Sequence, residues 1–191
     1  MPSATSSYGK KLPMPIISID TSPLTGTYTR LLVDELKKIP DLTIQLTGDN
    51  KPAARPDIVH FPFFDFFKAS LPVMRLSKTV VTIHDVIPLL FPEYYPVGKR
   101  GSLALLRQKF ILKTVNAVIT DSSVSKADII QHLGIADQKI TVVPLAGNPA
   151  LEPAEPAVIR AVKKRYDLAK NYILYVGDIN YNKNIPQLIK A

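Results

Sequence analysis

Short apolar runs separated by helix-like segments fill the first 145 residues, and this alternation constrains the fold more than any other feature of the sequence. Amphipathic segments at 25–39, 98–115 and about 123–133 stand between the runs. Strands that alternate with helices form a parallel sheet with helices on both faces. The sequence therefore predicts an α/β fold with a doubly wound parallel sheet. The runs are rich in β-branched residues: "PIISID" (15–20), "LTIQLTG" (42–48), "DIVHF" (57–61), "KTVVTIHD" (78–85), "NAVITDSS" (116–123) and "KITVVPL" (139–145).

The remainder of the chain predicts a second unit. "NPALEPAEPA" (148–157) is rich in proline and has little periodicity, which is typical of a linker. A helix at about 158–168 precedes an apolar strand, "YILYVGD" (172–178), and a helix that ends at Ala191. We expect a longer protein of which this chain is a piece. The predicted divisions are a polar leader (1–14), a first domain (15–147), the linker (148–157) and the beginning of a second α/β domain (158–191).

The composition limits the setting and the partners. The chain has no cysteine, which excludes disulfide scaffolds and cysteine-ligated metal sites. Neither a signal-peptide core nor an apolar run of about 18 residues is present, so we expect a cytoplasmic protein. The formal charge of +8 fits an anionic partner, such as nucleic acid, an acidic membrane surface or a phosphate-bearing ligand, and fits a solvated basic surface equally.

Several predicted strands end on polar residues. They are Asp20, His60, His84 with Asp85, and Asp121 with Ser122. Ligands of doubly wound sheets bind at the carboxyl ends of the strands, so these residues are candidates for one site. Asp20 and Asp121 also fit caps of loops or helices, and His60 fits a core histidine as well as a ligand contact. His84 is the strongest functional candidate of the set.

Familiar cofactor and metal motifs are missing from the sequence. Gly26 stands alone in its loop, so there is no dinucleotide fingerprint, and no P-loop is present. The chain has no H-E-x-x-H zinc motif, no aspartates spaced D-x-D and no G-x-S-x-G elbow. We therefore expect neither a cofactor nor a metal. A nucleic-acid partner is not expected either, because no helix-turn-helix, ribonucleoprotein or zinc motif supports one.

Three segments in one order resemble a known family. They are "TIHDVIPLLFPEYYP", "NAVITDSSVSKADIIQHLGIADQKITVVPL" and "ILYVGDINYNKNIPQLIKA". They closely resemble the group 1 (family 4-like) retaining GT-B glycosyltransferases, in particular a mannosyl- and rhamnosyltransferase subset. The match runs from about residue 15 to the end. It implies two Rossmann-like domains that face a cleft, with the acceptor on the amino-terminal domain and the nucleotide-sugar donor on the second, here truncated, domain.

The resemblance also implies roles for residues of the first domain. His84 matches a histidine that faces the cleft close to the transferred sugar, and we assign it the catalytic role. Asp85 and the following "PLLFPEYYP" stretch, with Tyr94, resemble a loop that shapes the acceptor pocket. The prolines there hold an aromatic-lined loop at low entropic cost. We assign acceptor binding to five residues: Gly26, His60, Asp85, Tyr94 and Ser122.

Donor binding falls to the opening of the second domain. The resemblance assigns it to Gly177, Asn182 and Lys183. Lys183 matches the lysine of a basic pair that contacts the donor diphosphate, but Asn182 stands where the family has arginine. The family's glutamate pair, spaced E-x7-E, has no counterpart among the glutamates of this chain.

The implied reaction transfers a sugar, mannose or rhamnose, from a nucleoside diphosphate donor to a glycan or lipid-linked acceptor with retention and without a metal. We expect the chain by itself to be inactive. Two alternatives stay open, a non-catalytic module that binds an acceptor or partner and a GT-B-fold sugar epimerase. We also expect residues 170–191 to drive self-association, or else to be disordered or packed irregularly on the first domain. Peripheral contact with the inner face of an acidic membrane is a further expectation.

Overall fold

The structure, a computed structural model, describes residues 14–21, 26–47 and 55–191. The chain divides into two compact units, one that ends at Leu145 and one that begins at Ala146. Of the expected polar leader, only Met14 falls within the described residues.

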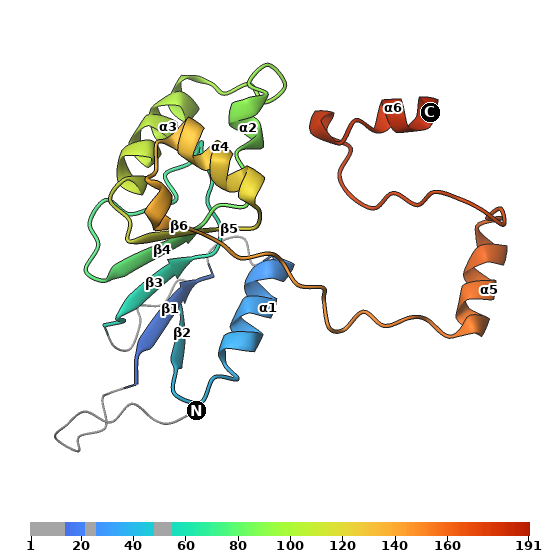
Figure 1. Cartoon of the computed structure of the whole chain (residues 1–191), viewed down its shortest axis with the longest axis horizontal. Coiled ribbons are helices and arrows are strands. Elements are labelled where there is room, and N and C mark those ends of the chain that lie inside the picture. Colours follow the sequence, from blue (N-terminus) through green and yellow to red (C-terminus); the bar gives the residue numbers. More distant parts are fainter. Residues whose placement is uncertain (1–13, 22–25, 48–54) are drawn as a thin grey trace. The chain divides into compact units, whose positions relative to one another are not determined.

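The first unit contains one parallel sheet, as the alternation of strands and helices predicts. Its described strands lie in the order β2-β1-β3-β4-β5-β6, and every neighbouring pair is parallel (Figure 1). The sheet confirms the α/β, Rossmann-like fold class and is consistent with the amino-terminal half of a GT-B fold. The strands are β1 (Ile16–Asp20), β2 (Thr43–Thr47), β3 (Ile58–Phe61), β4 (Lys78–Thr82), β5 (Ala117–Thr120) and β6 (Ile140–Val142).

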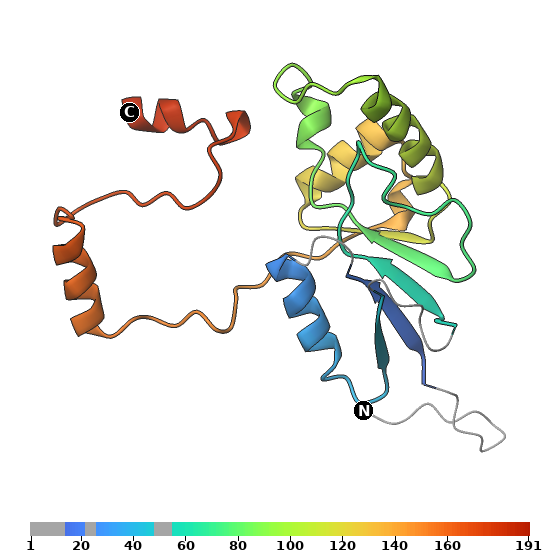
Figure 2. The ribbon, with the colours of Figure 1, turned by 180° about the vertical axis from the view of Figure 1, so that it is seen from behind.

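The strand order reverses between β1 and β3, and the helices divide accordingly. Helix α1 (Thr27–Leu36) follows β1 and lies on one face of the sheet, whereas α3 (Lys99–Leu112) and α4 (Ser123–Leu133) cover the other (Figures 1 and 2). Right-handed crossovers require this arrangement, because the chain moves across the sheet in opposite directions on the two sides of β1. The reversal is the place where doubly wound sheets bind ligands.

The main apolar core lies between the sheet and the pair α3 and α4. Val81 and Val118 from the sheet are fully buried there, together with Leu112 of α3 and Ile129 of α4. Apolar side chains from the long connection between β3 and β4, among them Leu71, complete this core. The core holds β4 and β5 rigidly side by side, and the carboxyl ends of these two strands carry the candidate site.

Helix α4 begins and ends as the sequence predicts. Ser122 is its N-cap, and the Ser122 Oγ accepts a hydrogen bond of 3.0 Å from the backbone N–H of Ser125. Gly134 ends the helix with a φ of 66°, a left-handed conformation that glycine adopts at low cost. Asp121, whose position also fits a cap, is therefore not the cap of this helix.

The second unit contains α5 (Pro156–Arg165), a 3₁₀ turn (Tyr181–Lys183) and α6 (Ile185–Lys190). The strand expected over 172–178 is wrong, because this segment forms no regular secondary structure and its apolar side chains are exposed. A parallel strand is held by hydrogen bonds to a neighbouring strand, and residues 146–191 contain none. The apolar pattern alone could not supply that neighbour.

Candidate functional site

His84 and Asp121 form a pair at the carboxyl edge of the sheet. His84 follows the end of β4 and Asp121 follows the end of β5, and these strands are neighbours. The His84 Nδ1 lies 2.7 Å from the Asp121 Oδ2, and the two side chains are 31% and 20% exposed. An ionised carboxylate can only accept, so Nδ1 carries the proton. The Nε2 of His84 is then the ring atom available to a ligand.

Tyr28 in the first turn of α1 packs against this pair. Its ring meets the His84 ring edge to face, with centroids 4.7 Å apart and an interplanar angle of 89°. The Tyr28 hydroxyl lies 3.4 Å from the Thr82 Oγ1. Burial raises the pKa of Tyr28, the hydrogen bond to Thr82 opposes this rise, and the charge of Asp121 adds to it. Tyr28 is therefore neutral, and its ring helps to fix the imidazole plane.

The sequence reasoning did not single out Tyr28. A usable signal was present, because the helix that follows β1 must begin at the carboxyl edge of the sheet. The first turn of α1, directly after Gly26, is thus brought to the same edge as His84. Nothing in the local pattern of the helix distinguishes Tyr28 from an ordinary surface tyrosine.

His60 lies behind the pair, next to Thr82. It belongs to β3, its side chain is 6% exposed, and its Nε2 lies 2.8 Å from the Thr82 Oγ1. Burial lowers the pKa of His60 from 6.5 to about 4. The ring is therefore neutral at physiological pH. Thr82 joins His60 to Tyr28 through hydrogen bonds, and the Tyr28 ring packs against His84.

An open pocket of about 280 Å³ adjoins His84. Asp85 is at its wall, and the Asp85 Oδ1 accepts a hydrogen bond of 2.9 Å from the backbone N–H of Ile87, which fixes the start of the short helix α2 (Ile87–Leu90). The pocket is mainly aromatic. Its walls are Phe63, Phe64, Asp65, Phe66, Phe67, Ile83, His84, Asp85 and Pro88. The phenylalanines come from the connection after β3, which the sequence reasoning did not single out.

The other predicted acceptor residues lie at the same edge or on its loops. Gly26 is the N-cap of α1, with open space around its Cα, and Ser122 caps α4 directly after Asp121. Tyr94 follows α2 and is half exposed. Asp85 lines the same pocket as His84, whereas His60 is connected to His84 indirectly, through Thr82 and Tyr28.

The predicted donor residues belong to the second unit. Gly177 has a φ of 153°, and a Cβ there would come within 2.8 Å of the Tyr175 hydroxyl, which itself donates to the Asp178 carbonyl at 2.7 Å. The glycine is therefore required by this turn. Asn182 and Lys183 lie in the 3₁₀ turn that follows.

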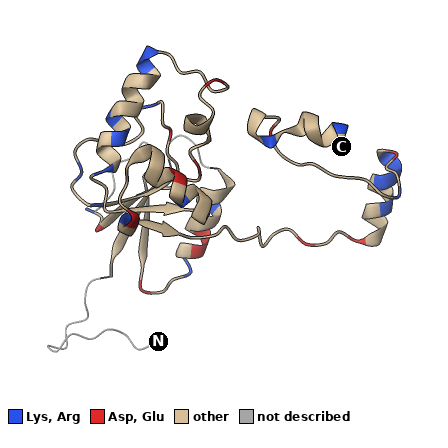
Figure 3. Ribbon diagram, turned by 45° about the horizontal axis from the view of Figure 1, so that its top comes forward, with Lys and Arg blue, Asp and Glu red and all other residues tan. Residues whose placement is uncertain are grey.

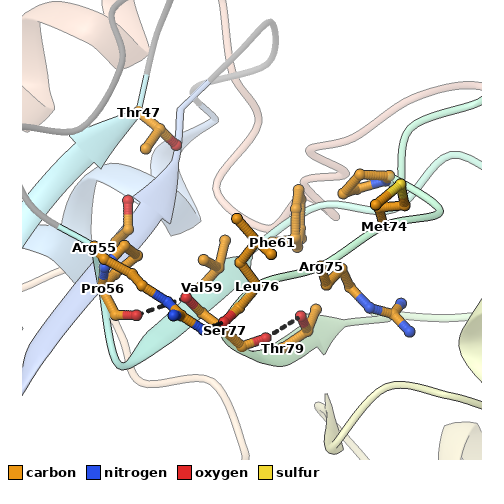
Figure 4. A pocket seen from close by; sticks show the side chains of 12 residues that line it. Thr47, Arg55, Pro56, Val59, Phe61, Met74, Arg75, Leu76, Ser77 and Thr79 are labelled. Atoms are coloured by element: carbon orange, nitrogen blue, oxygen red, sulfur yellow. Dashed lines mark hydrogen bonds between the residues drawn. The ribbon is translucent and has the colours of Figure 1, made fainter.

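A larger pocket, of about 660 Å³, lies on the face of the sheet opposite to the side chain of His60 (Figure 4). Ser18, Val59 and Thr79 stand side by side in its floor, and Met74 and Leu76 border it. Side chains alternate between the faces of a strand, so His60, next to Val59, points the other way. The two pockets share no lining residue in the part of the chain that the structure describes, so this one is separate from the pocket beside His84. Among the described residues, no group of three histidine or carboxylate side chains is placed to hold a metal ion.

The fold and this site define the class: a doubly wound α/β domain that presents a histidine–carboxylate pair and an aromatic pocket at the ligand-binding edge. Residues 24–150 match the family model of Glycosyltransferase Family 4. The chain belongs to this glycosyltransferase family. It is 27% identical over 144 residues to each of two Escherichia coli proteins named "Serotype-specific mannosyltransferase WbdA". The aligned region covers 71% of this chain but only 18% and 17% of those proteins, so the chain spans less than a fifth of their length.

Proposed function

We propose that the complete protein transfers a sugar, mannose or rhamnose, from a nucleoside diphosphate donor to a glycan or lipid-linked acceptor, with retention and without a metal. The pairing of His84 with Asp121 at the ligand-binding edge carries this proposal. Membership of the family and the similarity to a protein named as a mannosyltransferase support the class of reaction.

In this proposal His84 acts on the transferred sugar. Asp121 holds the imidazole through Nδ1, and Tyr28 restricts its plane. The His84 side chain is therefore fixed in one rotamer, with Nε2 directed toward the sugar. A hydrogen bond from a hydroxyl of the sugar to Nε2 strengthens as positive charge develops on the sugar ring in the transition state. His84 is not the general base, because the departing phosphate takes that role in a retaining transfer of this kind.

The acceptor occupies the aromatic pocket beside His84. The exposed ring of Phe63 offers the apolar side of a sugar ring a stacking surface, and Asp85 offers a polar wall. Gly26, Tyr94 and Ser122 complete the proposed acceptor site. On the second unit, Lys183 stabilises the departing diphosphate, with Gly177 and Asn182 in the same donor loop.

We further propose that residues 1–191 bind the acceptor but do not turn over a nucleotide sugar. The absent E-x7-E spacing and the irregular 172–178 segment support this division. The proposed location is the cytoplasm, at the inner face of a membrane. Among the described residues, no helix is both long and apolar enough to cross a membrane.

The test uses the protein from the intact gene. It is incubated with nucleoside diphosphate mannose or rhamnose and an acceptor glycoside, with and without a chelator. Release of nucleoside diphosphate and the anomeric configuration of the product are measured by chromatography and NMR. A retained product at an unchanged rate in chelator is expected. An inverted product, or loss of activity in chelator that Mg²⁺ restores, would refute that part of the proposal. Acceptor binding without any transfer would instead identify a binding module.

A further inference from the structure

Helix α3 carries an apolar ridge on its outer side that the fold does not use. Leu103, Leu106 and Phe110 are 69%, 66% and 70% exposed. Their spacing of three and four residues places them along one side of the helix. The opposite side supplies Ile111 and Leu112 to the core. A surface helix needs only one apolar face to fold, so this ridge is available for something outside the unit.

The ridge is bordered by positive charge on both sides. At 100° per residue, Arg100 falls on one side of the ridge, and Lys109 and Lys113 fall on the other. Arg107 lies on the same side as Arg100, but its guanidinium donates to the Leu71 carbonyl and is not one of the bordering charges. The helix also contains Lys99 and has no acidic side chain, as Figure 3 shows by the absence of red along α3. An apolar ridge between basic borders is typical of a helix that lies in the plane of an anionic membrane surface.

The neighbouring connection between β3 and β4 extends the same surface. Val73, Met74 and Leu76 are exposed there. Arg75 donates to the Thr114 hydroxyl and so ties this connection to the end of α3. Within residues 66–116 the sequence has only Asp85 and Glu93 as acidic residues. Asp65, in the same connection, is paired with Lys68, so positive charge predominates on this surface.

We propose that α3 lies in the plane of an anionic lipid bilayer, with its apolar ridge inserted among the acyl chains and Arg100, Lys109 and Lys113 at the headgroups. A bilayer fits better than a protein partner, because the ridge is a convex helix side and the bordering charges are of one sign. The inference rests on this surface alone and is independent of the transfer chemistry.

Binding is measured by vesicle flotation of the 191-residue chain. The vesicles are phosphatidylcholine alone or phosphatidylcholine with a third phosphatidylglycerol. We expect at least about 10-fold tighter binding to the anionic vesicles, and at least a 10-fold loss in Leu103→Gln/Leu106→Gln/Phe110→Gln. Val124→Gln is the matched control, since Val124 is 70% exposed on α4 and outside the ridge. Lys99→Gln/Arg100→Gln should weaken binding by about 5-fold per charge, an effect that salt reduces.

A spectroscopic arm reports on insertion. The chain contains no tryptophan, so Phe110→Trp introduces a single reporter whose emission should shift to shorter wavelength on anionic vesicles only. Circular dichroism of each variant confirms that the fold is kept. Equal binding to neutral vesicles, or a triple variant that binds like the parent, would overturn the proposal. The proposal would also be overturned if the parent chain did not bind vesicles and the triple variant lost self-association. That result would show that the ridge is a protein interface.

Discussion

The Nδ1 of His84 and the Oδ2 of Asp121, which are 37 residues apart in sequence, lie 2.7 Å from each other at adjacent strand ends. Their strands are held in register by β-ladder hydrogen bonds and by the core beneath, so the contact is preset by the fold. The Oδ1 of Asp121 is buried and has no hydrogen-bond partner among the described residues, which concentrates the interactions of the carboxylate on the imidazole. The pair is therefore a preorganised unit.

Replacing His84 by alanine in the complete enzyme should lower kcat far more than it weakens substrate binding. Loss of one well-placed hydrogen bond to the reacting sugar costs about 2–4 kcal/mol of barrier, or roughly 30- to 1,000-fold in rate. Stability should change little, because the side chain is at the edge and not in the core. Steady-state kinetics and thermal unfolding test this together. A variant that unfolds while its folded fraction keeps the normal kcat would show that His84 is structural.

Asp121→Asn should reduce kcat with little change in KM. An amide loses the charge-assisted hydrogen bond to Nδ1, which is worth about 1.5–3 kcal/mol, so we expect a loss of about 10- to 100-fold. The dependence of kcat on pH should change in the same variant, which a purely structural role would not cause. Asp137→Asn is the control, since Asp137 forms an exposed ion pair with Lys126. Equal effects of the two substitutions on kcat would contradict a positioning role.

His60 should make the first unit less stable in mild acid. Its pKa is lowered from 6.5 to about 4 in the folded state, so between these values the unfolded chain binds more protons. The contribution to stability is complete above pH 6.5 and is lost as the pH falls toward 4, by about 3 kcal/mol. Urea unfolding between pH 7 and 4.5 should show a smaller loss in His60→Gln. Parallel curves for the two proteins would mean that His60 is not buried and neutral as described.

Ser122→Ala should destabilise α4 by about 1 kcal/mol, because the N–H of Ser125 loses its capping acceptor. Ser123→Ala, the same change at the next residue, should have little effect on stability. The free energy of unfolding of both variants is obtained from urea titration. A comparable loss in Ser123→Ala would show that the cap lies one residue later than the structure places it.

Residues 170–191 should drive self-association of the 191-residue chain. Ile173 and Val176 are 82% and 84% exposed in a segment without strand partners, and exposed apolar segments with free backbone groups pair with other copies. Light scattering should show association that rises with concentration and falls in Ile173→Asn/Val176→Asn. Val143→Asn serves as a control on the first unit. A monomer at all concentrations would contradict this prediction.

The alternation of apolar runs and amphipathic segments was sufficient to predict the parallel sheet and most of its elements. This is because strand and helix periods are local properties of the chain, as are the cap at Ser122 and the stop at Gly134. The location of His84 at the carboxyl edge was also predictable from sequence, because the residue follows a buried strand. The strand at 172–178 was predicted wrongly, because its formation depends on a neighbour that the segment itself cannot provide.

The sequence by itself determined which residues stand at strand ends, and only the tertiary structure decided which of them meet. Strand order places β5 beside β4, and this brings Asp121 to His84 and not to the start of its own helix. The path of α1 places the Tyr28 ring against the same imidazole. Burial lowers the pKa of His60, so its ring is neutral. These contacts join residues between 22 and 56 positions apart, so their energies depend on packing and desolvation, which no local pattern encodes.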